Sequence, residues 1–233
     1  MTWPTEQDEL IARQLELAAL RPALWNPPEH LLIGAVWICF PRGLRGSGAA
    51  GDPAWAAAVV QTGGEADGRD LRRRREVVGQ ELRRGRASGP YLPGLLALRP
   101  GPLCEYVVRR LVPAPDVLLL DATGADHPRR AGFATHLGAV LDLPTIGVTH
   151  RPLIATGPWP ADEPGATSAL AIDGEQVATW LRTKPGARPL VVHPGWRTDL
   201  ATAVRVINLC NAGRRTPEPL RRARQAARLL RGP

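Results

Sequence analysis

The sequence contains little cysteine, almost no lysine and no long apolar run. Cys39, Cys104 and Cys210 are odd in number, far apart and set among apolar residues, a pattern typical of buried thiols and not of a disulfide framework or a zinc site. No apolar stretch approaches the length of a membrane-spanning helix, and the first residues lack the basic and apolar regions of an export signal. We therefore expect a cytoplasmic protein without a membrane partner.

The scarcity of lysine leaves arginine to carry nearly all the positive charge. Lys184 is the single lysine among 30 basic residues, and the formal net charge is +8. Such an excess of guanidinium groups suits a polyanion, because arginine binds phosphate in a bidentate way and stacks on bases. A GC-rich genome would also raise the ratio of arginine to lysine, but it does not explain the sign of the net charge.

Length and hydrophobic pattern predict a single domain of the α/β class over residues 1–233. The chain is 44% hydrophobic, which is enough for a full core. Apolar spacing predicts an N-terminal helix within a lead-in at about 5–30, capped by Thr5, and a basic C-terminal helix within 214–233. Short apolar runs predict strands at 31–40, 54–60, 75–84, 117–120, 145–148, 169–172, 176–182 and 190–193, and further helices at 95–111, 131–141 and 198–210, the last capped by Thr198.

The most informative stretch is D-A-T-G-A-D-H-P-R-R, which runs from Asp121 to Arg130. It follows the buried run 117–120, so Asp121 stands at the C-terminal end of a predicted strand, where ligands and metal ions bind in open α/β sheets. An Asp there can ligate Mg²⁺, and the backbone, imidazole and guanidinium groups after it can contact a phosphate. A turn or helix-cap acid is the simpler alternative for Asp121.

Two further segments have the composition of nucleic-acid contacts. Pro90 and Pro93 flank Tyr91 and Leu92 before Gly94, and such a stiffened loop can hold an apolar wedge outward to part a base step, although it could also be a buried turn. Four consecutive arginines occupy 72–75; they could follow a phosphate backbone or simply be solvated.

These motifs together resemble the endonuclease V family. They are P-Y-L-P-G-L-L-A-L-R at 90–99, the Asp121 stretch, P-T-I-G-V at 144–148 and P-G-W-R-T-D-L-A-T-A at 194–203, in that order. The resemblance implies a ribonuclease H-like mixed sheet flanked by helices. It also implies Mg²⁺-assisted hydrolysis of the second phosphodiester bond 3′ to deoxyinosine.

The same resemblance exposes departures at the metal site. Trp37 stands where the family has an Asp on the first strand, Pro100 where it has a Glu, and Trp196 where it has a His or Asp. Asp121 and His127 keep their places, whereas His150 replaces a Lys and Ala122 a Gly. Asp126 and Asp199 are the nearest substitute ligands by sequence, although Asp199 is also suited to cap a helix.

One remaining carboxylate cannot hold a pair of Mg²⁺ ions, so we expect cleavage to be weak or lost. The expected partner is DNA or RNA with a deaminated base, bound by a monomer. The alternatives are a divergent active nuclease, a nucleic-acid-binding pseudoenzyme and a scaffold with a protein partner. The residues expected to contact the substrate are Pro90, Tyr91, Leu92, Pro93, Gly94, His127, Arg129, Gly132, Gly147 and His150.

Overall fold

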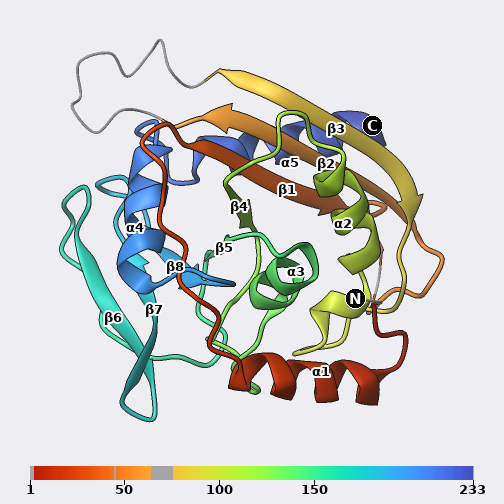
Figure 1. Ribbon diagram of the computed structural model, residues 1–233, viewed down its shortest axis with the longest axis horizontal. Coiled ribbons are helices and arrows are strands. Elements are labelled where there is room, and N and C mark those ends of the chain that lie inside the picture. The colour runs from red at the N-terminus through yellow and green to blue at the C-terminus, as the bar shows by residue number, and fades with distance from the viewer. Residues whose placement is uncertain (1–2, 45, 64–75, 233) are drawn as a thin grey trace.

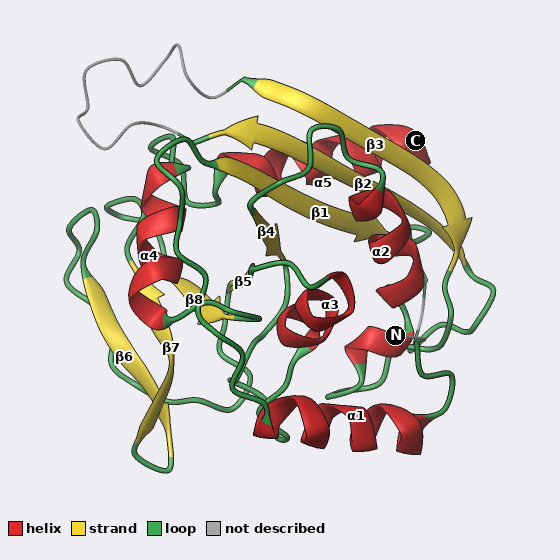
Figure 2. Cartoon of the chain, in the orientation of Figure 1, coloured by secondary structure: helices red, strands yellow, loops and turns green. Residues whose placement is uncertain are grey.

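The computed structural model describes residues 3–44, 46–63 and 76–232. Within these residues a mixed sheet of eight strands has the order β3-β2-β1-β4-β5-β8-β7-β6, and helices cover both of its faces (Figures 1 and 2). The strands are β1 (Leu32–Cys39), β2 (Pro53–Thr62), β3 (Val77–Arg86), β4 (Val117–Leu120), β5 (Thr145–Thr149), β6 (Thr167–Ile172), β7 (Glu175–Leu181) and β8 (Leu190–Pro194). The predicted α/β fold with a mixed, helix-flanked sheet is confirmed. The arginine run at 72–75 lies outside the described residues.

Strand directions follow from the connections. β1, β2 and β3 form an antiparallel meander, whereas β4 and β5 run parallel to β1. β8 turns back antiparallel to β5, and β7 and β6 continue the antiparallel pairing. All four residues of β4 are buried, which is why this strand is a continuous apolar run at the centre of the sheet.

The helices form two layers around this sheet. On one face, α1 (Gln7–Ala19), α2 (Gly101–Arg109) and α3 (Phe133–Leu141) share a core with β1 and β2. On the other face, α4 (Leu200–Leu209) and α5 (Glu218–Arg231) pack on β1, β4 and β5, and Figure 1 shows α5 crossing the sheet on the side opposite α2. None of the described helices is long and apolar enough to cross a membrane.

Three local predictions are corrected by the structure. The N-cap of α1 is Glu6, not Thr5, and the Glu9 carboxylate accepts the Glu6 N–H at 3.4 Å. The N-cap of α4 is Asp199, not Thr198, whose hydroxyl donates to the Thr145 carbonyl at 2.8 Å. The helix predicted at 95–111 begins instead as a 3-10 turn at Leu96–Leu98, and α2 starts only after Pro100 because prolines cannot continue a helix from its interior.

Candidate nucleic-acid site at a degenerate metal pocket

The pairing of β1 with β4 sets Trp37 beside Asp121. The last pair in their register is Val36 with Leu120, so Trp37 and Asp121 each stand one residue further along neighbouring parallel strands. Ala35 and Leu119, two residues earlier, belong to the core formed with α4 and α5. Because alternate side chains point to opposite faces of a sheet, Trp37 and Asp121 point to that same face.

Pro100 joins these two residues in one pocket of about 230 Å³. The rest of its lining is mainly aliphatic and aromatic, with Cys104 among it. Burial raises the pKa of the Cys104 thiol to about 12, so this sulfur is not a thiolate ligand at neutral pH. The structure therefore brings together three of the four positions at which the resemblance expects metal ligands. We call this cavity the Trp37–Asp121 pocket.

Asp121 is the carboxylate of this pocket. Its side chain reaches solvent at the pocket mouth, but the surrounding protein atoms displace enough water to raise its pKa, and the positive charge of Arg224 acts in the opposite direction. Arg224 therefore lies close enough to influence Asp121, although the two side chains form no ion pair within 4.0 Å among the described residues.

Arg224 is the site residue that the sequence did not single out. It belongs to α5, whose Leu220, Ala223 and Ala227 are buried against the sheet. Its guanidinium carbon lies 5.4 Å from the centroid of the Trp37 ring. The helical spacing of apolar residues could have indicated it. Arg224 directly follows the buried Ala223, so it lies at the border of the apolar face of the helix, from which a long side chain reaches the edge of the sheet.

Trp196 lies elsewhere. It follows β8, which runs antiparallel to β5, so it stands beside Thr145 at the start of β5 and not beside the strand ends that hold Trp37 and Asp121. Its backbone N–H donates to the Thr145 hydroxyl at 2.8 Å, and its indole N–H donates to Asp142 at 3.2 Å. The expected grouping of Trp196 with the other three positions is therefore not found.

Both substitute ligands proposed from the sequence hold backbone groups instead. The Asp126 carboxylate accepts the N–H groups of Leu153, Ile154 and Ala155 at 2.7–2.9 Å. Asp199 accepts the Thr202 N–H at 2.6 Å. Across the part of the chain that the structure describes, no three His, Cys, Asp or Glu side chains cluster closely enough to hold a metal ion.

The loop 90–94 is fastened through one carbonyl. Gly94 O accepts hydrogen bonds from Gln14 Nε2 at 3.0 Å, His127 Nε2 at 3.0 Å and Arg129 Nη2 at 2.7 Å. Arg129 Nε also donates to Gln14 Oε1 at 2.6 Å. The structure thus places His127 and Arg129 behind the loop as its supports, and burial lowers the pKa of His127 and so favours its neutral form.

The residues between the two prolines of this loop differ in exposure. Tyr91 is 49% exposed, and its N–H donates to Ser47 O at 2.7 Å. Leu92 is partly buried and packs against the core shared with α2 and α3. The outward-facing part of the expected wedge is therefore Tyr91.

Gly132 and Gly147 are explained by close backbone packing. A Cβ at Gly132 would lie 2.3 Å from Thr123 O, and one at Gly147 would lie 2.1 Å from Ala122 O. Both distances are too short for any side chain. The structure places these glycines against the segment that follows β4, and they set its position relative to α3 and β5.

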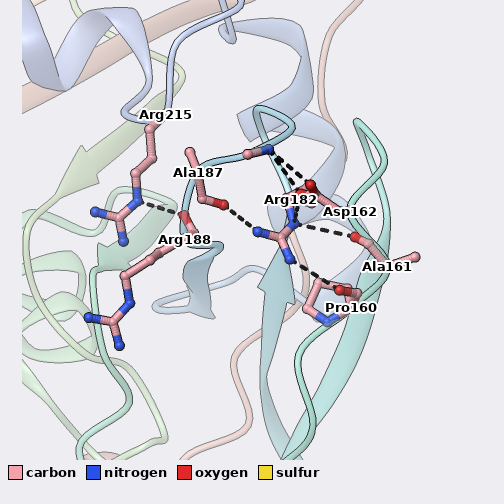
Figure 3. Close-up of polar contacts among 8 residues, drawn as sticks. Pro160, Ala161, Asp162, Arg182, Ala187, Arg188 and Arg215 are labelled. Atoms are coloured by element: carbon pink, nitrogen blue, oxygen red, sulfur yellow. Dashed lines mark hydrogen bonds and ion pairs between the residues drawn. The ribbon is translucent and has the colours of Figure 1, made fainter.

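A second group of basic side chains lies near the end of β5. His150 is exposed, and its pKa is lowered by partial loss of solvent and by the positive charges of Arg215 and Arg224. Arg215 is tied to the carbonyls of Arg188 and Pro189 at 2.7 and 3.1 Å. In Figure 3 the Arg188 and Arg215 side chains extend to the same side, whereas Arg182 turns the other way to hold residues 160–162. This arrangement gathers positive charge near the candidate site.

Comparison with known proteins agrees with this geometry. A family model described as endonuclease V matches residues 69–225. An endonuclease V from Roseiflexus sp. (strain RS-1) is 39% identical over 177 residues, which cover 76% of each chain. The crystal structure of endonuclease V from Streptomyces avermitilis has a TM-score of 0.83 at 31% identity and covers 98% of this chain and 94% of its own.

A more distant structure has the same fold. Endonuclease V from Ciona intestinalis, in complex with a 23mer DNA containing an inosine followed by a ribo-adenosine, has a TM-score of 0.74 at 22% identity and covers 96% of this chain and 95% of its own. The ribonuclease H-like architecture expected from the sequence is thus confirmed. From the extent of the family model and the identity to its relatives, the chain belongs to the endonuclease V family.

Proposed function

We propose that this family member binds nucleic acid that carries a deaminated base and that its Mg²⁺-dependent cleavage is weak or lost. The observation that carries the proposal is the presence of Trp37 and Pro100 with Asp121 in one pocket. The resemblance places carboxylates at all three of these positions. The fold keeps the pocket, but two of the expected ligands are apolar.

The donor set at the Trp37–Asp121 pocket does not fit a pair of magnesium ions. Mg²⁺ requires oxygen ligands in nearly ideal octahedral geometry. Tryptophan offers one N–H donor and no oxygen, and proline has no polar side-chain atom. The positive charge of Arg224 acts on Asp121 and opposes the binding of a cation there. Without the ions, neither activation of water nor alignment of the phosphate is provided.

Binding is supported by features that do not depend on the metal. The Ciona intestinalis relative was solved with inosine-containing DNA, and this chain keeps the fold that holds the loop 90–94. Tyr91 is exposed on this loop, and the Gly94 carbonyl of the loop accepts hydrogen bonds from three side chains. We propose that Tyr91 contacts the opened base step, since reading a single base requires that base to leave the stack.

The remaining expected contacts have distinct parts in this proposal. His127 and Arg129 keep the loop in position, whereas Gly132 and Gly147 allow the segment after β4 to pack closely against α3 and β5. Arg188 and Arg215 add positive charge on which a phosphate backbone can lie, and neither has a carboxylate partner among the described residues. His150 lies near Arg215, and its lowered pKa favours the neutral form, which can still form a hydrogen bond to a phosphate. Backbone contacts of this kind position a nucleic acid without reading its sequence.

The test is a gel assay on labelled duplexes that are identical except for one deoxyinosine, each run with Mg²⁺, with Mn²⁺ and with EDTA. We expect a mobility shift that favours the deoxyinosine duplex in all three conditions, with no product band. An inosine-bearing RNA of the same sequence decides between DNA and RNA as the preferred partner. Asp121→Ala is run beside the wild type throughout.

Two results would overturn the proposal. Metal-dependent cutting that disappears in Asp121→Ala would mean that the chain assembles a ligand set other than the one described and is an active nuclease. Equal shifts of the deoxyinosine and unmodified duplexes would mean that the base is not read.

A further inference from the structure

Arg224, on α5, places a positive charge beside Trp37 and Asp121, two residues of the Trp37–Asp121 pocket. Its guanidinium lies over the face of the Trp37 ring at 5.4 Å, a distance at which the ring quadrupole attracts a cation. The presence of Trp37 therefore has two effects: the expected metal ligand is absent, and the indole ring provides a surface on which the guanidinium group stacks. The proximity of Asp121 adds a second, electrostatic restraint on the same side chain.

No hydrogen bond from the Arg224 guanidinium is found within the described residues. Its Nε is buried and has no hydrogen-bond partner among the described residues. A buried, unpaired donor on a charged group is unfavourable unless water or a ligand completes it. Arg222, two residues away on the same helix, contrasts with it because it is exposed and pairs with Glu218 at 2.8 Å.

Arg224 also opens onto a larger basic groove. This groove has a volume of about 620 Å³, and Arg42, Arg221 and Arg228 line it together with Arg224. Glu218 pairs with Arg221, whereas Arg42, Arg224 and Arg228 have no carboxylate within 4.0 Å among the described residues. Unpaired guanidinium groups that line one groove repel each other unless an anion binds between them.

The spacing of these arginines suits a phosphodiester backbone. Arg221, Arg224 and Arg228 lie on α5, and at about 1.5 Å per residue they extend over roughly 10 Å of the helix axis. One strand of a duplex carries a phosphate about every 3.4 Å, so this length matches about three phosphates. Guanidinium forks fit phosphate oxygens in a bidentate manner.

We propose that Arg224, seated on Trp37, receives a backbone phosphate of the bound nucleic acid in place of a metal ion, and that this protein binds its target without a divalent cation. This inference rests on the proposed function, since it concerns how the same site holds its nucleic acid. It assigns a binding role to the residue changes that remove the metal ligands. The groove on α5 continues the contact to the neighbouring phosphates.

The experiment measures fluorescence anisotropy of a labelled deoxyinosine duplex against the full-length protein, in EDTA and in Mg²⁺, over a series of NaCl concentrations. We expect wild-type affinities that agree within about twofold in EDTA and Mg²⁺. Arg224→Ala should lower the affinity by about tenfold and reduce the slope of log K against log salt by about one, the effect of one lost phosphate contact. Arg222→Ala is the matched control, with a change below about twofold and an unaltered slope, because this side chain does not line the groove.

Arg224→Lys separates charge from shape. We expect it to keep the salt slope but recover only part of the affinity, because an ammonium group lacks the planar fork that stacks on Trp37. Thermal unfolding of each variant, monitored by circular dichroism, identifies loss of affinity caused by loss of fold. If Arg224→Ala proves unstable, Arg224→Lys and Arg224→Gln still report on the slope.

Different failures have different meanings. Wild-type binding that requires Mg²⁺ would overturn the inference, whereas a preference for the deoxyinosine duplex in Mg²⁺ would still support the proposed reading of the base. An Arg224→Ala variant that binds as tightly as the wild type in EDTA would also overturn the inference and leave the proposed function intact. Absence of any preference for deoxyinosine in the wild type would remove the proposed function and the inference with it.

Discussion

At the scale of single residues, the same side-chain chemistry has opposite meanings at Asp121 and Asp126. Asp121 follows β4 directly and lines the Trp37–Asp121 pocket, with a pKa raised by its surroundings. Asp126, five residues later, is fully buried, and three backbone N–H groups saturate its carboxylate. From the sequence alone, both aspartates were candidate ligands for a metal ion. Only the position of the segment 153–155 shows that Asp126 organises a loop and is not available to a metal.

Asp126→Asn tests that assignment. The amide keeps the shape of the side chain but loses the charge and one acceptor oxygen, so an N–H group of residues 153–155 that bonded to that oxygen loses its partner. We expect the free energy of unfolding to fall by about 1–3 kcal/mol, measured by urea denaturation at neutral pH. Asp173→Asn makes the same chemical change at an exposed side chain (91% accessible) and should change the stability by less than about 0.5 kcal/mol. Similar losses in both variants would contradict the structural role of Asp126.

At the scale of elements, the loop 90–94 combines a fixed base with an exposed tip. Its two prolines, its glycine and its aromatic residue were visible in the sequence. The supports were not, because Gln14 belongs to α1 and Arg129 to the segment after β4, far apart along the chain. The contribution of His127 and Arg129 is therefore to hold the loop, a role that a motif comparison does not distinguish from direct substrate contact.

Tyr91→Ala is the sharpest test of the loop. Leu92 packs against the core, so changing it would confuse binding with stability, whereas Tyr91 is 49% exposed. Loss of an aromatic contact to a base costs about 1–3 kcal/mol, so we expect the preference for deoxyinosine over unmodified duplex to fall about tenfold. Competition binding measures the preference. The control is Leu24→Ala, at a 60% exposed residue whose neighbours Ala23 and Trp25 bond to Arg197 and not to the loop. Equal weakening for both duplexes would count against a wedge.

For the helix α5, the sequence predicted the element but not which of its side chains face the sheet. Its position in the chain and its basic character were predicted from apolar spacing, and the structure has it at Glu218–Arg231. Which of its arginines meets the sheet depends on how the helix crosses β1 and β2, and this is a long-range property. Trp196 illustrates the same limit, since its separation from Asp121 follows from the antiparallel direction of β8.

At the scale of the whole molecule, the sequence predicted the elements better than their arrangement. Runs such as 117–120 and 145–148 are apolar on both faces and so predict central strands, and both are observed. The sheet order, however, is fixed by pairings between distant segments, and only the resemblance to a family pointed to it. The two helical layers then decide what is buried. They enclose His136 and His193 completely, and local sequence gives no reason to expect these two histidines in a core.

These buried histidines predict a loss of stability in acid. His136 is fully buried and stacks on Trp3 with ring centroids 4.8 Å apart. Burial lowers its pKa to about 4 from an ordinary value of 6.5, and the charge of Arg13 acts in the same direction. His193 is also fully buried, and burial lowers its pKa too, against the opposing charge of Asp126. Between pH 6.5 and about 4 the unfolded chain therefore binds more protons than the folded chain, so the free energy of unfolding falls as the pH falls.

For His136 this loss amounts to as much as about 3 kcal/mol at the acid end of the window. Urea unfolding at several pH values from 7.5 to 4.5 measures it. His136→Gln removes the titrating group. Whatever stability this substitution loses at pH 7.5, the stability of the variant should approach that of the wild type as the pH falls. His30→Gln replaces an exposed histidine and should leave a curve parallel to the wild type. A His136→Gln curve that also stayed parallel would mean that the imidazole becomes protonated within the fold, and that the layer around Trp3 opens to water before the molecule unfolds.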